Sequence, residues 1–388
     1  MLRDLRANRS WLWVFSALMT ACAVIVSYGL SGHLSVPDVD WLADRAEAEA
    51  SPDDPAQWRP VPSVALHGWL PESRRSSRNA FNVRRCSVRV SDILDMPPAV
   101  DDIPALDNPR CITPQQQRSL RPDDEVIGVT VGDTARCYPL AILRWHCVVN
   151  DVLEGQPVCL VFDPLSGASL GFSRAVGGDM LSFGVSGKAY NGVTLLYDRE
   201  HRNLWSPLTG ECIAGPWTRR AVIASFPVER TCWASWLQRH PQTTLLSRNT
   251  GIGRPYDLDP YAQVQRPDAK GTVNYWQDPG LILAPPLQPS PQGGPAPKTV
   301  VLALRPGSQG ATLAFVPPAA GNQPLSVVRE VDGSRLRITW DPRPASRTFT
   351  AVDERGESPR QVTCFWFAWY SAYPQTQVVY LHSSASGG

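Results

Sequence analysis

The chain has 388 residues, and 43% of them are hydrophobic, which excludes an intrinsically disordered protein and allows two or three domains with buried cores. The formal net charge is +1, and almost all of the 37 basic residues are arginines scattered among acidic residues. Because nucleic-acid binding requires clustered basic side chains, we expect no nucleic-acid partner.

The N-terminal segment 1–30 carries the clearest signal in the sequence. Residues 1–10 contain three arginines, and residues 11–30 then run without any charged side chain. A helix of this length reaches about 30 Å, the thickness of a bilayer's hydrocarbon core. We therefore expect a cytoplasmic tail over 1–10, a transmembrane anchor over 11–30 and a periplasmic or extracellular body. A cleaved signal peptide and lipidation of Cys22 are the alternatives.

Composition and turn signals divide the rest of the chain. Residues 31–100 are rich in proline and charged residues and are expected to form a poorly ordered stalk. Short β-like runs separated by turn residues then begin, with a hairpin expected where Gly132-Asp133 separates 125–131 from 134–140. Residues 142–151 are expected as another of these β-like runs. The expected units are a first β-rich repeat over 101–251, a Pro/Gly-rich connector over 252–298 and a second β-rich repeat over 299–382.

Two pairs of similar segments predict that these β-rich units are repeats. At a constant offset in numbering, "TCWASWLQRHPQTTLL" (231–246) matches "CFWFAWYSAYPQTQVV" (364–379), and its tryptophans have helical spacing. Upstream, Asp163-Pro164 matches Asp341-Pro342 in the same order. The fold predicted is mainly β (α+β): two unequal β-rich repeats, each ending in a short Trp-containing helix, outside one N-terminal transmembrane helix.

The nine cysteines contain no Cys-x-x-Cys pair, so zinc ribbons and thioredoxin-like motifs are absent. In an exported body some cysteines could form disulfides, whereas buried free thiols are the alternative. The sequence predicts no cofactor and no metal site.

One candidate catalytic group lies in the first repeat. His146 is a potential general base, Asp163 a group that could orient it, and Ser166 a conceivable nucleophile. No nucleophile-elbow pattern surrounds Ser166, and a histidine that hydrogen bonds within the sheet is the structural alternative.

A second group is expected to bind a ligand. Residues 184–192, "GVSGKAYNG", are expected to form a Gly-rich loop that presents Lys188, Tyr190 and Asn191, although a wide turn is an equal alternative. Trp205 and Ser206, beside a "PLTG" turn, are predicted pocket residues. Residues 198–203, "DREHRN", are expected to form a polar hairpin tip and not a metal site, since neighbouring strand residues point to opposite faces.

Several stretches resemble an uncharacterised family, catalogued as domain of unknown function 3179. They are "IPALDNPR" (103–110), "YPLAILRWHCVVND" (138–151), "GVSGKAYNGVTLLYDREHRNLWSPLTGECIAGP" (184–216), "WLQRHPQTTLLSR" (236–248), "PYDLDPYA" (255–262) and "FWFAWYSAYPQT" (365–376). The resemblance implies a bacterial or archaeal protein, often exported or membrane-anchored, with no settled activity. Where such proteins usually carry a "CPLCG" turn, this chain has "DPLSG", which implies that thiol or metal chemistry at this turn is lost.

These observations favour a membrane-anchored extracytoplasmic binding or scaffolding protein whose ligand is a small molecule or a protein, held in the membrane through residues 11–30. A hydrolytic enzyme that uses His146 and Asp163 is the first alternative. A metal or redox protein is the second, and the missing Cys-x-x-Cys turn disfavours it.

Overall fold

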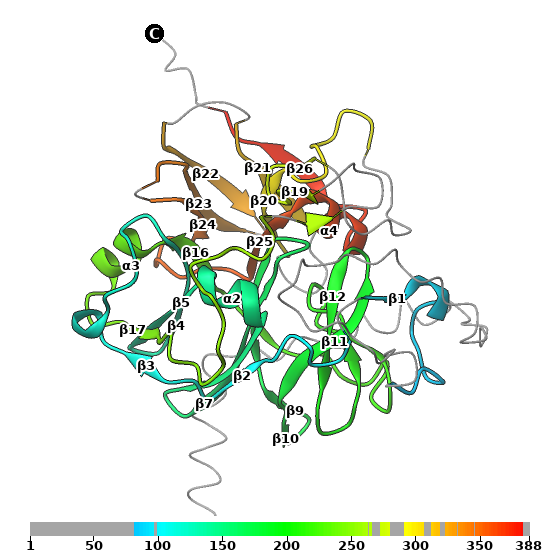
Figure 1. Cartoon of the computed structure of the whole chain (residues 1–388). Coiled ribbons are helices and arrows are strands. Elements are labelled where there is room, and N and C mark those ends of the chain that lie inside the picture. Colours follow the sequence, from blue (N-terminus) through cyan, green and yellow to red (C-terminus); the bar gives the residue numbers. More distant parts are fainter. Residues whose placement is uncertain are drawn as a thin grey trace, which may run out of the picture. The chain divides into compact units, whose positions relative to one another are not determined.

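The computed structural model describes residues 81–96, 99–262, 264–265, 272–279, 291–305, 312–318, 323–331, 333–344 and 346–382. These residues form a mainly β fold, as the sequence predicted, and it contains three short α-helices (Figure 1). The predicted tail, the predicted membrane span 11–30 and most of the predicted stalk lie outside the described residues. Within the described ranges, no helix is long and apolar enough to cross a membrane.

The largest sheet draws strands from both predicted repeats, in the order β2-β6-β7-β8-β25-β20-β21-β26, with β15 also paired to β8. Its nine strands are β2 (Leu106–Asp107), β6 (Val148–Leu153), β7 (Gln156–Asp163), β8 (Ala168–Ser173), β15 (Ser225–Phe226), β20 (Val300–Leu304), β21 (Leu313–Val316), β25 (Gln361–Phe365) and β26 (Gln377–Tyr380). Every residue of β8 and the last six of β7 are buried. Strands covered on both faces are apolar without alternation, as "VCLVF" is in β7.

A second sheet has the order β16-β4-β5-β17-β3. Its strands are β3 (Cys111–Ile112), β4 (Glu125–Val131), β5 (Thr134–Pro139), β16 (Glu229–Cys232) and β17 (Thr244–Leu246). The hairpin predicted at Gly132-Asp133 is confirmed, since β4 and β5 pair antiparallel on either side of it. Gly132 has a φ of 55°, a conformation that glycine adopts without strain.

A third sheet has the order β1-β11-β12-β13-β14 and corrects two predictions. Its strands are β1 (Leu94–Asp95), β11 (Phe183–Tyr190), β12 (Val193–Asp198), β13 (Leu204–Trp205) and β14 (Cys212–Ala214). Residues 184–190 are strand and not loop, because the glycines permit a bulge, and the hairpin turn lies at Asn191-Gly192, both with positive φ. The predicted stalk over 31–100 extends too far toward the C-terminus. Of its described residues, Phe81 and Ile93 pack under this sheet and belong to the folded body.

The remaining strands form three smaller groups. A meander contains β22 (Leu325–Val331), β23 (Ser334–Asp341) and β24 (Thr348–Val352), and two ribbons contain β9 (Ala175–Val176) with β10 (Asp179–Met180) and β18 (Val264–Gln265) with β19 (Thr272–Val273). The α-helices are α2 (Leu140–His146), α3 (Trp233–Arg239) and α4 (Trp366–Ala372), and the 3-10 helices are η4 (Val90–Asp92) and η5 (Pro114–Gln116). The Trp-containing helix predicted within 231–246 is thus confirmed as α3.

Two four-stranded arrangements share one pairing pattern. In β16-β4-β5-β17 and in β25-β20-β21-β26, the first two contacts are antiparallel and the last is parallel. A Trp-containing helix, α3 or α4, connects the first-named strand to the last in each. Trp236 Nε1 donates to Thr243 Oγ1 at 2.9 Å, and Trp369 Nε1 donates to Thr376 Oγ1 at 3.0 Å. All four tryptophans of the two helices are buried.

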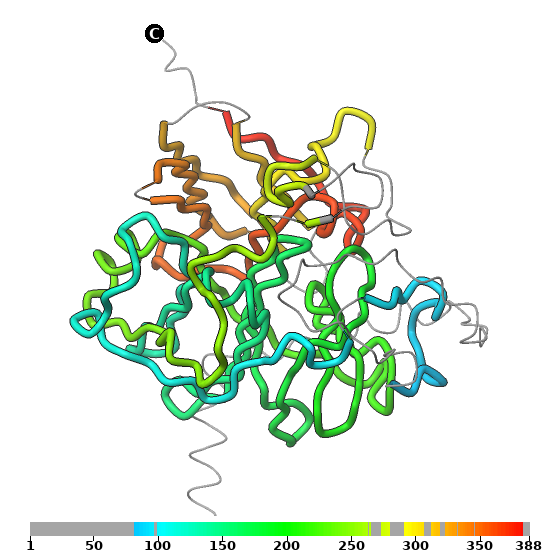
Figure 2. The backbone as a smooth tube through the Cα atoms, in the orientation of Figure 1, coloured from blue at the N-terminus to red at the C-terminus, as the bar shows by residue number. Residues whose placement is uncertain are grey.

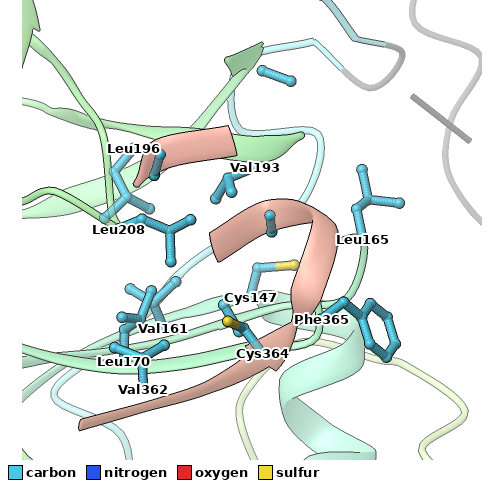
Figure 3. Packing of buried hydrophobic residues seen from close by; sticks show 14 of the residues in the cluster. Cys147, Val161, Leu165, Leu170, Val193, Leu196, Leu208, Val362, Cys364 and Phe365 are labelled. Atoms are coloured by element: carbon cyan, nitrogen blue, oxygen red, sulfur yellow. The ribbon is translucent and has the colours of Figure 1, made fainter. Parts of the chain in front are cut away.

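The C-terminal part of the chain packs directly against the first predicted repeat. Strand β25 lies beside β8, which Figure 2 shows as the red C-terminal segment adjoining the green part of the tube. Figure 3 shows Val362 and Cys364 of β25 close to Val161 and Leu170 of β7 and β8 in one hydrophobic cluster. A single core therefore holds both predicted repeats.

Candidate functional site

His146 is the last residue of α2, and the strand expected over 142–151 begins only at Val148. The apolar residues Leu140, Ile142 and Leu143 bury one side of this short helix, which the β-like reading of the sequence missed. The His146 side chain is 0% exposed. Its Nδ1 lies 2.8 Å from the carbonyl oxygen of Pro104, and its Nε2 lies 2.7 Å from the hydroxyl of Tyr256.

These two contacts determine which nitrogen of a neutral His146 ring carries the proton. A carbonyl oxygen can only accept, so Nδ1 carries the proton and Nε2 of the neutral ring accepts from the Tyr256 hydroxyl. Burial, and to a smaller extent the positive charge of Arg254, lower the pKa of His146 to about 4, although the hydrogen bond to Pro104 opposes them. His146 is therefore a neutral, fully hydrogen-bonded side chain at neutral pH.

Asp163 and Ser166 hydrogen bond to each other and not to His146. The Ser166 hydroxyl donates to Asp163 Oδ2 at 2.6 Å, and the Thr194 hydroxyl donates to Asp163 Oδ1 at 2.9 Å. The Ser166 and Thr194 backbone N–H groups also donate to Oδ2. Burial raises the pKa of Asp163, and these donors oppose that rise. Since both His146 nitrogens have other partners, the predicted His146–Asp163 pair does not form in this structure.

The predicted ligand-binding residues on β11 and its turn have structural partners. The Lys188 ammonium, 0% exposed, forms an ion pair with Asp95 of β1. Asn191 Nδ2 donates to the carbonyl oxygen of Ser371 in α4 at 3.0 Å. The partly buried Tyr190 packs against the hydrophobic cluster under the third sheet. These contacts hold the sheet together and connect it to α4.

Trp205 and Ser206 are buried as well. Trp205 is 0% exposed and its Nε1 donates to Asp198 Oδ2 at 2.7 Å. The same carboxylate accepts from Asn203 Nδ2 and from the His201 backbone N–H, so it organises the tip predicted over 198–203. The Ser206 N–H donates to the carbonyl oxygen of Glu211 across the following turn. Trp205 therefore stabilises the turn between β12 and β13, and Ser206 stabilises the turn between β13 and β14.

A pocket of about 320 Å³ lies elsewhere, lined by residues between Ile112 and Asp259, and we call it the Arg144 pocket. Its lining combines apolar side chains from β3, α2 and β17 with polar residues from the loop before β4 and the segment after β17. The lining residues are Ile112, Gln117, Ser119, Leu120, Arg121, Asp124, Pro139, Ala141, Ile142, Arg144, Leu245, Leu246, Arg248, Tyr256, Asp257, Leu258 and Asp259. None of the predicted catalytic or ligand-binding residues lines it.

The Arg144 pocket carries side chains of both charges. Arg144 Nη1 lies 3.0 Å from Asp259, and Arg248 Nη1 lies 2.8 Å from Asp257. Arg121 and Asp124 add one more residue of each sign. The Nε atom of Arg144 is buried and has no hydrogen-bond partner among the described residues. The pocket thus combines cationic and anionic groups with the apolar side chains of β3, α2 and β17.

Further arginines lie behind this lining. Glu125 contacts Arg230 at 2.9 Å, Arg144 at 3.6 Å and Arg347 at 3.8 Å. Burial alone would raise the pKa of Glu125, but the three guanidinium groups outweigh burial and lower it. Three cations thus surround this one carboxylate, and Arg144 is shared between Glu125 and Asp259 of the lining.

Tyr256 connects the Arg144 pocket to His146. It lines the pocket, and its hydroxyl contacts both His146 Nε2 and the Thr250 hydroxyl, each at 2.7 Å. His146 thus supports the pocket wall from behind. Two separate sequence signals mark this region: Arg144 stands close before His146, and "PYDLDPYA" contains Tyr256, Asp257 and Asp259. Only the tertiary structure shows that they belong to one site.

The cysteines of the described part show no disulfide. Cys86 and Cys111 are partly buried, and Cys137, Cys147, Cys159, Cys212, Cys232 and Cys364 are buried free thiols. Burial raises the pKa of Cys147 and Cys364, so these thiols stay protonated. Among the residues that the structure describes, no group of three or more His, Cys, Asp or Glu side chains is arranged to hold a metal ion.

Comparison with known proteins gives one match. The family model described as "Protein of unknown function (DUF3179)" matches residues 100–357, well over half of the chain. No curated protein and no solved structure matches. The match includes the whole lining of the Arg144 pocket.

Proposed function

The chain belongs to the DUF3179 family of proteins of unknown function, and on that premise we propose that it is a small-molecule-binding protein whose ligand occupies the Arg144 pocket. The observation that carries this proposal is the pocket itself, which combines an apolar floor with charged groups of both signs. Its volume of about 320 Å³ is at the lower end of the range for ligand sites. The ligand is therefore a small metabolite and not a polymer.

The charges of the lining define the chemistry of this ligand. A carboxylate fits Arg144, which lines the pocket, because guanidinium groups form bidentate contacts with planar anions. An ammonium or hydroxyl group fits the Asp257 carboxylate, which is 80% exposed. We infer a molecule that carries both groups, such as an amino acid or a hydroxy acid.

The location that goes with this function is a proposal based on the N-terminal sequence. Arginines before an uncharged run over 11–30 favour an anchor with the body outside the cytoplasm. In that arrangement the protein captures its ligand at the outer surface of the membrane. The hydrolytic alternative loses its basis, because His146 and Asp163 have separate partners.

We also propose that the two β-rich units are repeats that interlock reciprocally. The carbonyl oxygen of Ser166, after Asp163-Pro164, accepts from the N–H of Phe365, the N-cap residue of α4. The carbonyl oxygen of Ser346, after Asp341-Pro342, accepts from the N–H of Cys232, the N-cap residue of α3. Each Asp-Pro turn thus contacts the Trp helix of the other unit. This reciprocity supports a structural role for "DPLSG". In place of the "CPLCG" turn of similar proteins, this turn connects one unit to the Trp helix of the other.

Thermal-shift screening of the full-length chain against amino acids, hydroxy acids and sugar acids tests the proposed function. The best ligand is then titrated by calorimetry into Arg248→Met and Arg335→Met. Each substitution removes one arginine from an ion pair with an exposed carboxylate, but only Arg248 lines the pocket.

We expect Arg248→Met to weaken binding about tenfold, equivalent to about 1.4 kcal/mol, and Arg335→Met to leave it unchanged. Equal affinities in the two variants, or no ligand from these classes, would refute the proposal.

A further inference from the structure

Arginines are concentrated in the segment where the chain enters the described fold. Residues 73–91 contain six arginines and no acidic residue, in contrast to the mixed charges of the rest of the sequence. Three of the six, Arg84, Arg85 and Arg89, belong to the described residues, and all three are exposed. Arg89 pairs with Asp92 at 3.1 Å. This segment is therefore basic in its own right.

Hydrogen bonds join this segment to the loop after β14, which carries two more arginines. The carbonyl oxygen of Arg85 accepts from the N–H of Gly215 at 3.0 Å and from the Thr218 hydroxyl at 2.9 Å. Arg219 and Arg220 follow directly, and both are exposed. The structure thus brings two pairs of arginines together. The name Arg85 surface is used below for these four residues: Arg84, Arg85, Arg219 and Arg220.

Few acidic side chains offset these charges. Residues 81–92 and 211–222 together contain five arginines and two acidic residues. Within the described part of the chain, no carboxylate forms an ion pair with Arg84, Arg85 or Arg220. An anionic partner can therefore approach this part of the molecule without displacing an internal ion pair of these three side chains.

An aromatic side chain lies beside the Arg85 surface. Trp217 is partly buried, and its ring centroid lies 4.4 Å from that of His201. The Trp217 backbone N–H donates to Asn203 Oδ1 at 2.9 Å, which holds the loop against the turn between β12 and β13. Tryptophan is enriched where proteins meet the headgroup region of a bilayer, because its ring is apolar and its indole N–H is polar. Exposed arginines next to such a ring fit the same environment.

We propose that the Arg85 surface docks the folded body onto a bilayer that contains anionic lipids. Guanidinium groups form strong hydrogen bonds with lipid phosphates. The attraction of arginines to an anionic lipid surface extends over a Debye length, ~10 Å at ~0.1 M salt. A lipid surface is favoured over another polyanion because the arginine-rich segment connects the expected membrane span 11–30 to the fold. The docking does not depend on the function proposed for the Arg144 pocket.

Chemical modification of arginines in the full-length chain tests this docking. The chain reacts with phenylglyoxal in the presence of nanodiscs of phosphatidylcholine alone or of nanodiscs that also contain phosphatidylglycerol, and mass spectrometry measures the rate at each arginine. We expect the anionic nanodiscs to slow the reaction of Arg84, Arg85 and Arg220 at least about fivefold. Arg335 and Arg355, which are exposed in the C-terminal part of the chain, should react equally fast with both kinds of nanodisc.

A pair of double variants separates docking from a general effect of anionic lipid. Arg84→Gln/Arg85→Gln should restore the reaction of Arg220 to its rate with phosphatidylcholine alone, whereas Arg335→Gln/Arg355→Gln should not. High salt should act like the first variant, because it screens exposed charges. The proposal is overturned if Arg220 reacts equally fast with both kinds of nanodisc, if Arg335 is protected as strongly as Arg220, or if only a soluble polyanion such as polyphosphate protects Arg220.

Discussion

The Trp-helix regions around α3 and α4 pair their strands in the same order, yet only the α3 region borders the Arg144 pocket. The two regions share the strand pairing, the buried tryptophans and the Trp-to-Thr hydrogen bond. The α3 region adds α2 after β5 and the segment 248–259 after β17, whereas the described residues between β21 and β22 contain no α-helix. The shared elements thus build the framework, and the unshared ones supply the polar groups of the pocket.

The largest effect is expected from the shared tryptophans. Trp236→Ala and Trp369→Ala each remove a side chain that is 2% exposed, so each should lower the free energy of unfolding by about 3–5 kcal/mol. Denaturant unfolding monitored by circular dichroism measures both. If one variant lost this much free energy of unfolding and the other lost almost none, the two regions would not be structurally equivalent.

The next effect belongs to the α3 region alone and depends on pH. Because the pKa of His146 is lowered to about 4, folding favours the neutral ring over the protonated one. Its stabilisation is complete above the unfolded-state value of about 6.5 and is lost as pH falls from there to about 4, by about 3 kcal/mol in total.

Urea unfolding of wild type and His146→Gln at pH 7.5, 5.5 and 4 follows this loss. The wild type should lose more stability than the variant over this range. His240→Asn is the control, because His240 is partly exposed at the end of α3 and its pKa is lowered less. An identical slope in wild type and His146→Gln would show that His146 does not titrate as described.

A smaller effect is expected from the threonines that accept the tryptophan N–H. Thr243→Val and Thr376→Val keep the side-chain shape and leave a buried indole N–H without a partner, which costs about 1–3 kcal/mol. Thr376 also contacts the Thr312 hydroxyl, so its replacement should cost slightly more. Thermal denaturation compares the two variants. An unchanged melting temperature for either variant would show that its Trp-to-Thr hydrogen bond does not stabilise the fold.

Much of the framework could be predicted from local patterns. Trp233 and Trp236 at helical spacing, the Gly132-Asp133 turn and the apolar run of β7 each determine a local conformation, and the structure confirms them. Family membership was predicted from quoted stretches and is confirmed. By contrast, the glycines of 184–192 suggested a loop where sheet pairing with β12 imposes a strand with a bulge.

The candidate site was much harder to predict. Asp163, Lys188 and Trp205 are polar or aromatic residues in a conspicuous sequence context, but each proved to be buried with a structural partner. The Arg144 pocket draws its lining from segments as far apart in the chain as Ile112 and Asp259, and no local pattern shows that β17 brings them together. Tertiary pairing, and not residue type, determines which polar groups share a cavity.

The most direct test of the central claim is a crystal structure of the full-length chain with the tightest ligand from the amino-acid and hydroxy-acid screen. We expect electron density for the ligand in the Arg144 pocket, with its carboxylate on Arg144 and its ammonium or hydroxyl group near Asp257. A ligand bound elsewhere, with the Arg144 pocket filled only by solvent, would contradict the proposed function.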